Sequence, residues 1–92
     1  MSKTIWRFKL IEKETDNEKI PLKWIDCNTY DELKQVNLVV DGRETQDTHL
    51  SICAVGNEIM FDSDDELYRI KKVISQNGLL ETNIDITCFK VQ

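Results

Sequence analysis

Apolar and polar side chains alternate along several short stretches of this chain, and that alternation limits its fold more than any other feature. Along residues 4–12, Trp6 and Phe8 fall on one face of an extended chain, while Arg7 and Lys9 fall on the other. A period of two residues is that of a strand with one buried face. Further stretches with the same period follow at residues 20–27, 49–54, 58–62 and 84–88.

Turn-forming residues separate these stretches in pairs, which predicts hairpins. Thr15–Glu18 lies between the first two strands. Trp6 and Trp24 are expected to share the buried inner face of that hairpin rather than to form a platform for stacked bases. Gly56–Asn57 stands where a two-residue hairpin turn requires positive φ. The stretches on either side of it are therefore predicted to form a second hairpin.

Two tracts with the spacing of a capping box predict helix starts. In Thr29–Glu32 and again in Ser63–Glu66, a hydroxyl residue is followed three positions later by a glutamate, whose carboxylate can reach back to the cap residue. After the second tract, apolar residues recur at helical spacing until Gly78 offers a stop. That apolar stripe consists of Leu67, Ile70, Val73 and Ile74.

The end of the first helix stays open at this point. Tyr30 and Leu33 keep helical spacing, yet residues 37–40 fit a short strand equally well. Residues 41–48 are polar and are expected to form an exposed loop. The acids of residues 62–66 alternate as in a calcium loop, but the glycine and the distal glutamate of that loop are missing, so helix capping explains them better.

The predicted order is hairpin, helix, hairpin, helix, strand, written ββαββαβ. Helices that cover one face of a mostly antiparallel sheet of about five strands give a two-layer α+β sandwich, which is the expected fold class. A chain of 92 residues can enclose one hydrophobic core and hardly two. We therefore expect a single domain over residues 1–92.

The net charge of −5 is unevenly distributed along the chain. Residues 24–66 hold eleven acidic and two basic side chains, a net charge of −9, whereas the flanking segments 1–23 and 67–92 each carry +2. An acidic block disfavours direct contact with phosphate backbones and favours a basic partner. The same block could also serve only to keep a small domain soluble.

The cysteines Cys27, Cys53 and Cys88 are odd in number and lack a C-x-x-C pair, which argues against a disulfide framework and a zinc site. Free, buried thiols in a reducing compartment are the better interpretation. Lys3 and Arg7 interrupt the N-terminal apolar residues before a secretory signal can form, and no uncharged run is long enough to span a bilayer. We expect a cytoplasmic protein that does not bind membranes.

Catalytic chemistry finds little support in the sequence. His49 is the only histidine, and on a strand it would lie about 13 Å from Cys53, too far for a hydrogen bond. The glycines fall at turn or cap positions, so a glycine-rich phosphate loop is not expected. We therefore predict a protein that is not an enzyme and has no catalytic residues, no cofactor and no metal ion.

Residues 48–58, with their glycine-asparagine turn, are followed by a set of spaced residues: Ser63, Glu66, Ile70, Lys72, Ile74, Ser75, Asn77 and Gly78. This pattern resembles the hairpin and following helix of small acidic anti-CRISPR proteins, phage-encoded inhibitors of Cas9. Those inhibitors hold acidic and amide side chains against the arginines that read the PAM. The resemblance implies that Asn57 and Glu58 make the matching contacts. This chain differs from them in the two strands before its first helix.

The acidic block and the resemblance together predict a binding protein, an inhibitor from a phage or mobile element that covers a basic, nucleic-acid-binding surface of another protein. Direct binding of nucleic acid is not expected. Two alternatives remain, an accessory subunit that self-associates through sheet edges and a small enzyme that uses His49. The predicted partner-binding residues are Asp41, Glu44, Asp47, Asn57 and Glu58.

Overall fold

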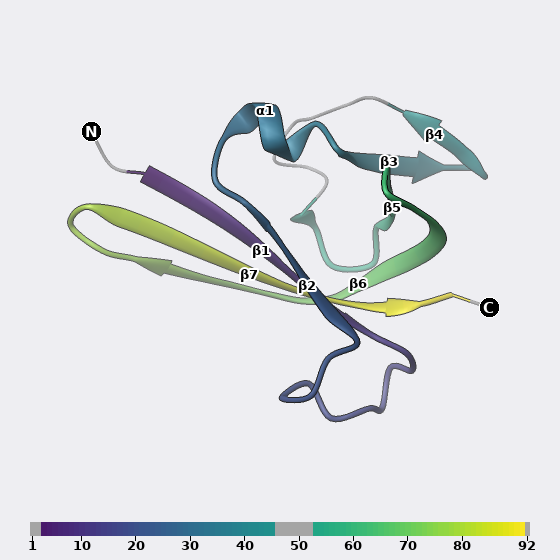
Figure 1. Ribbon diagram of the computed structural model, residues 1–92. Coiled ribbons are helices and arrows are strands. Elements are labelled where there is room, and N and C mark those ends of the chain that lie inside the picture. The colour runs from purple at the N-terminus through teal and green to yellow at the C-terminus, as the bar shows by residue number, and fades with distance from the viewer. Residues whose placement is uncertain (1–2, 46–52, 92) are drawn as a thin grey trace.

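The computed structural model describes residues 3–45 and 53–91, which form one curled mixed sheet (Figure 1). In these residues the sheet has seven strands in the order β2-β1-β7-β6-β5-β3-β4. β1 and β7 run parallel, and the other neighbouring pairs run antiparallel. The strands are β1 Lys3–Ile11, β2 Lys23–Cys27, β3 Val36–Val40, β4 Arg43–Thr45, β5 Glu58–Phe61, β6 Asp64–Asn77 and β7 Glu81–Lys90. A helical turn, α1 (Tyr30–Leu33), lies between β2 and β3.

This architecture contradicts the predicted α+β sandwich with two helices. The described residues contain one helix of four residues, so helices do not form a second layer over the sheet. The sheet curls on itself instead (Figure 1), and its buried apolar side chains form one core cluster. The core residues come from most of the strands and from α1: Trp6, Phe8, Leu10, Cys27, Leu33, Val36, Ile59, Phe61, Tyr68, Ile70, Ile86 and Cys88.

Residues 64–77, predicted as the second helix, form the long strand β6. Their apolar spacing imitates a helix because the strand is bulged, and its pairing with β7 shifts register between Ile70 and Lys72. Tyr68 and Ile70 are buried before the bulge, and Val73 packs against the same core after it. One inserted residue changes a spacing of two into a spacing of three, so part of a helical pattern appears in a strand.

The tract Ser63–Glu66, predicted as a helix cap, lies at the turn from β5 into β6. Phe61 pairs with Asp64, which leaves a two-residue loop between them. The Asp64 carboxylate accepts a hydrogen bond from the Glu66 amide at 2.7 Å. Asp side chains that bond an amide two residues on are typical of turns as well as of helix starts. The acidic tract therefore shapes a hairpin and begins no helix.

The cap at Thr29 is confirmed. Its hydroxyl accepts a hydrogen bond from the Glu32 amide at 3.1 Å, and the Glu32 carboxylate accepts one from the Asn28 amide. The helix ends at Leu33, whose side chain is buried, and β3 begins at Val36. Of the two endings left open by the sequence, the short strand is the right one.

The segment predicted as an exposed loop contains a tight hairpin in its described part, residues 41–45. Asp41 and Gly42 have positive φ values of 52° and 77°, as both central residues of a type I′ turn require. Val40 and Arg43 pair across this turn, and β4 follows. The aspartate-glycine dipeptide after an apolar run is the sequence signal for this turn.

β1 and β2 pair antiparallel, as predicted, and Trp6 and Phe8 are buried. The prediction for Trp24 is wrong, because this residue pairs with Lys9 and its side chain is 48% exposed. The cationic groups of Arg7 and Lys9 lie 5.6 and 5.0 Å from the centre of its ring. The alternating pattern of residues 20–27 therefore assigned Trp24 to the wrong face of the sheet, the buried one.

The predicted second hairpin is also wrong. β5 pairs with β3 on one side and with β6 on the other, so both of its edges are occupied. Gly56 does have positive φ, at 93°, but its amide donates to the Ile70 carbonyl at 2.8 Å. His49 and the other residues of 46–52 lie outside the described residues. The last predicted strand is confirmed as β7.

The described part of the chain has no helix long and apolar enough to cross a membrane.

Candidate functional site

The structure brings together four of the five predicted partner-binding residues, Asp41, Glu44, Asn57 and Glu58. Glu44 on β4 and Glu58 on β5 both stand opposite Val39 of β3, so they lie on the same face of the sheet with one strand between them. Asp41 occupies the adjoining β3–β4 turn, and Asn57 directly precedes β5. Asp47 lies outside the described residues.

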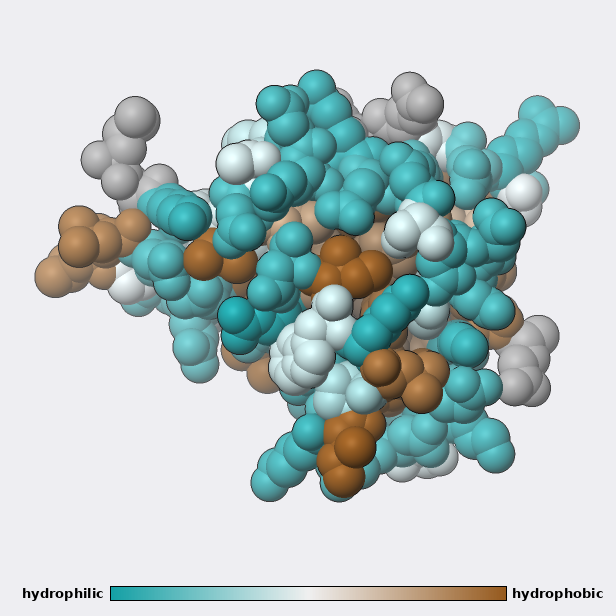
Figure 2. Space-filling model, in the orientation of Figure 1, coloured by the Kyte–Doolittle hydropathy of each residue, from teal (hydrophilic) through white to brown (hydrophobic). Residues whose placement is uncertain are grey.

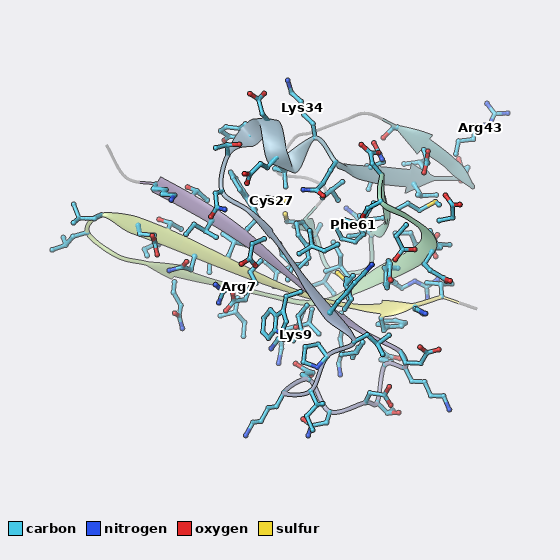
Figure 3. The ribbon with its side chains drawn as sticks, in the orientation of Figure 1. Arg7, Lys9, Cys27, Lys34, Arg43 and Phe61 are labelled. Carbon is cyan, nitrogen blue, oxygen red and sulfur yellow. The ribbon has the colours of Figure 1, made fainter. Side chains whose placement is uncertain are left out.

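Basic side chains partly neutralise this group. Arg69 donates to the Glu58 carboxylate at 2.7 Å, and the Glu58 side chain is 29% exposed. Arg43 lies on the same hairpin as Asp41 and Glu44, at the far right of Figure 3. Asp41 and Glu44 are exposed and remain available to a partner, whereas Glu58 is held by its own arginine.

A more acidic surface lies where α1 meets the β5–β6 turn. We call it the acidic end, and it consists of Asp31, Glu32, Asp62, Asp64, Asp65 and Glu66. Its basic neighbours in the described chain are Lys34, which pairs with Asp31, and Lys23, which pairs with Asp64. Sequence reasoning missed this surface because it assigned the acids of residues 62–66 to a helix cap.

Backbone and side-chain hydrogen bonds hold the two parts of the acidic end together. The Asp62 amide donates to the Gln35 carbonyl at 2.9 Å, two residues after α1 ends. The Asp62 carboxylate also accepts from the buried Asn37 side chain at 2.7 Å. In contrast, Asp65 and Glu66 are exposed, and their carboxylates have no ion-pair partner among the described residues. These two acids are the ones free to meet another molecule.

Asp64 has a structural task at the same place. Its carboxylate accepts from Lys23 and from the Tyr68 hydroxyl, each at 3.0 Å, which ties β2 to the start of β6. Burial opposes the charge of Asp64, but the hydrogen bonds from Lys23, the Glu66 amide and Tyr68 outweigh it and lower the pKa of this carboxyl. Burial and the bond to Asp64 raise the pKa of Tyr68.

Half of the basic side chains outside the acidic end pair with acids nearby, whereas Lys3, Lys9, Lys13, Lys19 and Arg43 have no ion-pair partner among the described residues. Glu18 of the β1–β2 loop pairs with Lys71 at 3.0 Å and with Lys72 at 2.8 Å, and these bonds lower the pKa of Glu18. Arg7 pairs with Asp26 at 3.1 Å. In Figure 3, Arg7 of β1 lies well below Lys34, which follows α1 at the top of the view. Unpaired exposed charge therefore lies in two parts of the described chain, acidic at Asp65 and Glu66 and basic at Lys13 and Lys19 of the β1–β2 loop.

The thiols are poor nucleophiles in this fold. Burial raises the pKa of Cys27 and of Cys53 to about 11, and it also raises the pKa of Cys88. A thiol of this kind holds its proton at neutral pH and does not act as a nucleophile. Within residues 3–45 and 53–91, no three His, Cys, Asp or Glu side chains converge closely enough to hold a metal ion.

A shallow depression of about 280 Å³ lies between the β1–β2 loop and the end of β7. Glu12 and Lys90 on its rim pair with each other at 3.5 Å. Because this depression is shallow and two of its charged side chains pair with each other, we assign no site to it. The lining residues are Glu12, Lys13, Glu14, Phe89 and Lys90.

Comparisons with models of protein families, with curated proteins and with solved structures give no match for this chain. The resemblance to Cas9 inhibitors stays a prediction, but the two elements that carried it are corrected by the structure. Asn57 and Glu58 do not form the tip of a hairpin, and residues 64–77 are a strand.

Proposed function

We propose that this chain is a non-enzymatic binding protein whose acidic end meets a basic surface of another protein. The observation that carries the proposal is the exposed, unpaired state of the Asp65 and Glu66 carboxylates, which follow Asp62 and Asp64 at the β5–β6 turn. Surfaces of opposite charge steer association and suppress wrong partners. Proteins that bind nucleic acid neutralise its phosphates with Lys and Arg side chains, so they present basic surfaces, and we propose a partner of that class.

The second part of the proposed surface is the exposed pair Asp41 and Glu44 on the β3–β4 hairpin. Both residues belong to the same half of the sheet as the acidic end, and neither carboxylate has an ion-pair partner in the described chain.

We also propose that the protein works in the reducing cytoplasm, because its three cysteines are free thiols.

The test compares variants that change net charge equally at different places. Asp65→Lys with Glu66→Lys reverses the acidic end, and Asp41→Lys with Glu44→Lys reverses the hairpin. Glu14→Lys with Asp16→Lys is the matched control in the β1–β2 loop. The unchanged chain and each of the three double variants serve as bait in an extract of the source cells. A protein that binds the unchanged chain and the control, but not the other two variants, is then purified as the candidate partner.

For such a partner, the acidic-end variant should associate about tenfold more slowly than the unchanged chain at low salt, and the difference should shrink as salt rises. The control should associate at the unchanged rate. If the control slows association as much as the acidic-end variant, or if no protein distinguishes the baits, the acidic end is only a solvated surface and the proposal fails.

A further inference from the structure

The edges of the sheet differ in how well they are protected from pairing with another chain. β2 is an edge of five residues that begins shortly after Pro21 and carries Lys23 and Asp26. β4 is an edge of three residues that carries Arg43 and Glu44. Short strands, charges and proline are the usual means by which proteins keep an edge from pairing. Both outermost strands of the sheet, β2 and β4, are therefore protected from pairing with another chain.

β6 has a third edge, along the part of the strand that extends past β5. Its outer side is occupied as far as Ile70, whose amide and carbonyl bond the segment before β5. Beyond it, no strand in the described part of the chain pairs with the outer side of Lys71–Asn77. Val73–Asn77 contains no charged residue and no proline. This edge lacks the protection that β2 and β4 have.

The ladder between β6 and β7 determines which backbone groups of this edge point outward. Near the hairpin loop, the Gly78 amide donates to the Glu81 carbonyl at 2.8 Å, so this pair bonds inward. Residues of an antiparallel strand alternate between bonding the neighbour on one side and pointing to the other. The N–H and C=O groups of Asn77, Ser75 and Val73 therefore point away from β7, toward a position where a further strand would lie.

Two exposed apolar groups lie near the ends of this edge. Leu79 and Leu80, in the loop between β6 and β7, are 99% and 81% exposed. Ile20 and Leu22, in the loop between β1 and β2, are 77% and 56% exposed. Figure 2 shows apolar atoms at the end of the β6–β7 hairpin, on the left, and around the β1–β2 loop, at the bottom.

The β1–β2 loop is held against the base of the free edge. Glu18 pairs with Lys71 and Lys72, and Lys71 also donates to the Glu14 carbonyl at 2.6 Å. The loop residues Ile20 and Leu22 follow closely in the chain. One apolar group therefore lies near the base of the edge and the other lies beyond its tip.

We infer that this edge pairs with the same edge of a second copy of the chain, forming an antiparallel two-fold dimer. With Ser75 opposite Ser75 of the second copy, Val73 stands opposite Asn77, and the outward groups of both strands bond each other. Leu79 lies four residues from this centre, about 14 Å along the strand, and so does Lys71. Each apolar hairpin tip then meets the β1–β2 loop of the other copy.

Sedimentation equilibrium of the full chain over a range of concentrations tests this dimer. Ser75→Lys puts two like charges directly opposite each other at the two-fold axis, which disfavours strand pairing. Because Ser75 is exposed in the monomer, the substitution should leave its fold intact. We expect Ser75→Lys to raise the dimer Kd at least about tenfold. The matched control Val40→Lys, on an exposed residue far from the edge, should leave Kd unchanged.

A second variant tests the apolar contact separately. Leu79→Ser with Leu80→Ser should also raise Kd, whereas Val40→Ser should not. Hydrogen exchange adds a local measurement, since the amides of Val73, Ser75 and Asn77 should exchange more slowly as dimer forms. A chain that remains monomeric at millimolar concentration overturns the inference. So does a dimer that is insensitive to Ser75→Lys, or one whose protected amides lie in β2 or β4.

Discussion

Two tracts of this chain carry the same sequence signal and have different structures. Thr29–Glu32 and Ser63–Glu66 each place a hydroxyl residue three positions before a glutamate and four before a leucine. The first tract caps the helical turn α1. The second forms the turn between β5 and β6 and continues as a strand.

A cap motif provides hydrogen-bond acceptors for the nearby backbone amides. The comparison shows that it does not decide whether the next residues form a helix or a strand. After Thr29, the chain has one helical turn, and β3 then finds pairing partners on both sides. After Ser63, the chain pairs first with β5, where Asp64 stands opposite Phe61, and from Tyr68 onward it also pairs with β7. In both places, pairing with other strands overrides the local preference for a helix. It does so after one helical turn in the first tract and directly after Ser63 in the second.

The largest expected effect comes from Tyr68→Ala. In the predicted helix, Tyr68 is off the apolar stripe, whereas in β6 its ring is 1% exposed and packs against Phe61 with ring centres 5.8 Å apart. Removing it should lower the free energy of unfolding by about 3–5 kcal/mol, as for other buried aromatic residues. Urea denaturation measures this loss.

Ile74→Ala is the matched substitution for that experiment. Ile74 belongs to the predicted helical stripe, but it is 45% exposed on β6. At a protein concentration where the chain is monomeric, its replacement should cost less than half as much as that of Tyr68. If Ile74→Ala lowers the free energy of unfolding more than Tyr68→Ala does, residues 64–77 form the predicted helix. The contrast between the two tracts is then wrong.

The next effect concerns Asp64, whose carboxylate has a role in the second tract that no acid has in the first. Asp64→Asn removes charged hydrogen bonds to Lys23 and Tyr68, which should cost about 1–3 kcal/mol at neutral pH. The folded-state pKa is lowered, so the stabilisation is complete above the unfolded value of about 4 and is lost as pH falls through the folded value.

Thermal melts of Asp64→Asn and of the unchanged chain between about pH 6 and about pH 2 measure this dependence. The variant should lose less stability on acidification, although Glu18, whose pKa is also lowered, leaves part of the dependence in place. Asp65→Asn is the control, because this neighbouring carboxylate is exposed. An equal acid dependence in Asp64→Asn and the unchanged chain would show that the contact with Lys23 does not stabilise the fold.

Local patterns predicted those parts of the fold that local interactions determine. The alternation at Trp6 and Phe8, the cap at Thr29 and the last strand are examples. The long parallel pairing of β1 with β7 joins the two ends of the chain, and no local signal announces it. The bulge between Ile70 and Lys72 is likewise set by the ladder with β7, so the sequence alone suggested a helix.

The candidate site shows the same division. Charge counting found an acidic middle segment, and it selected Asp41, Glu44 and Glu58, which β3 brings onto one part of the sheet. It could not foresee that Arg69 would engage Glu58, because that contact depends on the pairing of β5 with β6. It also assigned Asp65 and Glu66 to a helix start, so their exposure became visible only with the fold.

The smallest expected effects compare the two hydroxyl residues directly, through Thr29→Ala and Ser63→Ala. In the first tract, the Glu32 amide donates to the Thr29 hydroxyl at 3.1 Å, so the alanine variant loses a cap and should be destabilised by about 1 kcal/mol. In the second tract, the corresponding Glu66 amide donates to the Asp64 carboxylate instead. Because Ser63 is exposed and its hydroxyl has no part in that bond, Ser63→Ala should change stability by less than about 0.5 kcal/mol. Both values come from urea denaturation under identical conditions, and equal losses of about 1 kcal/mol in the two variants would mean that Ser63 caps a helix after all.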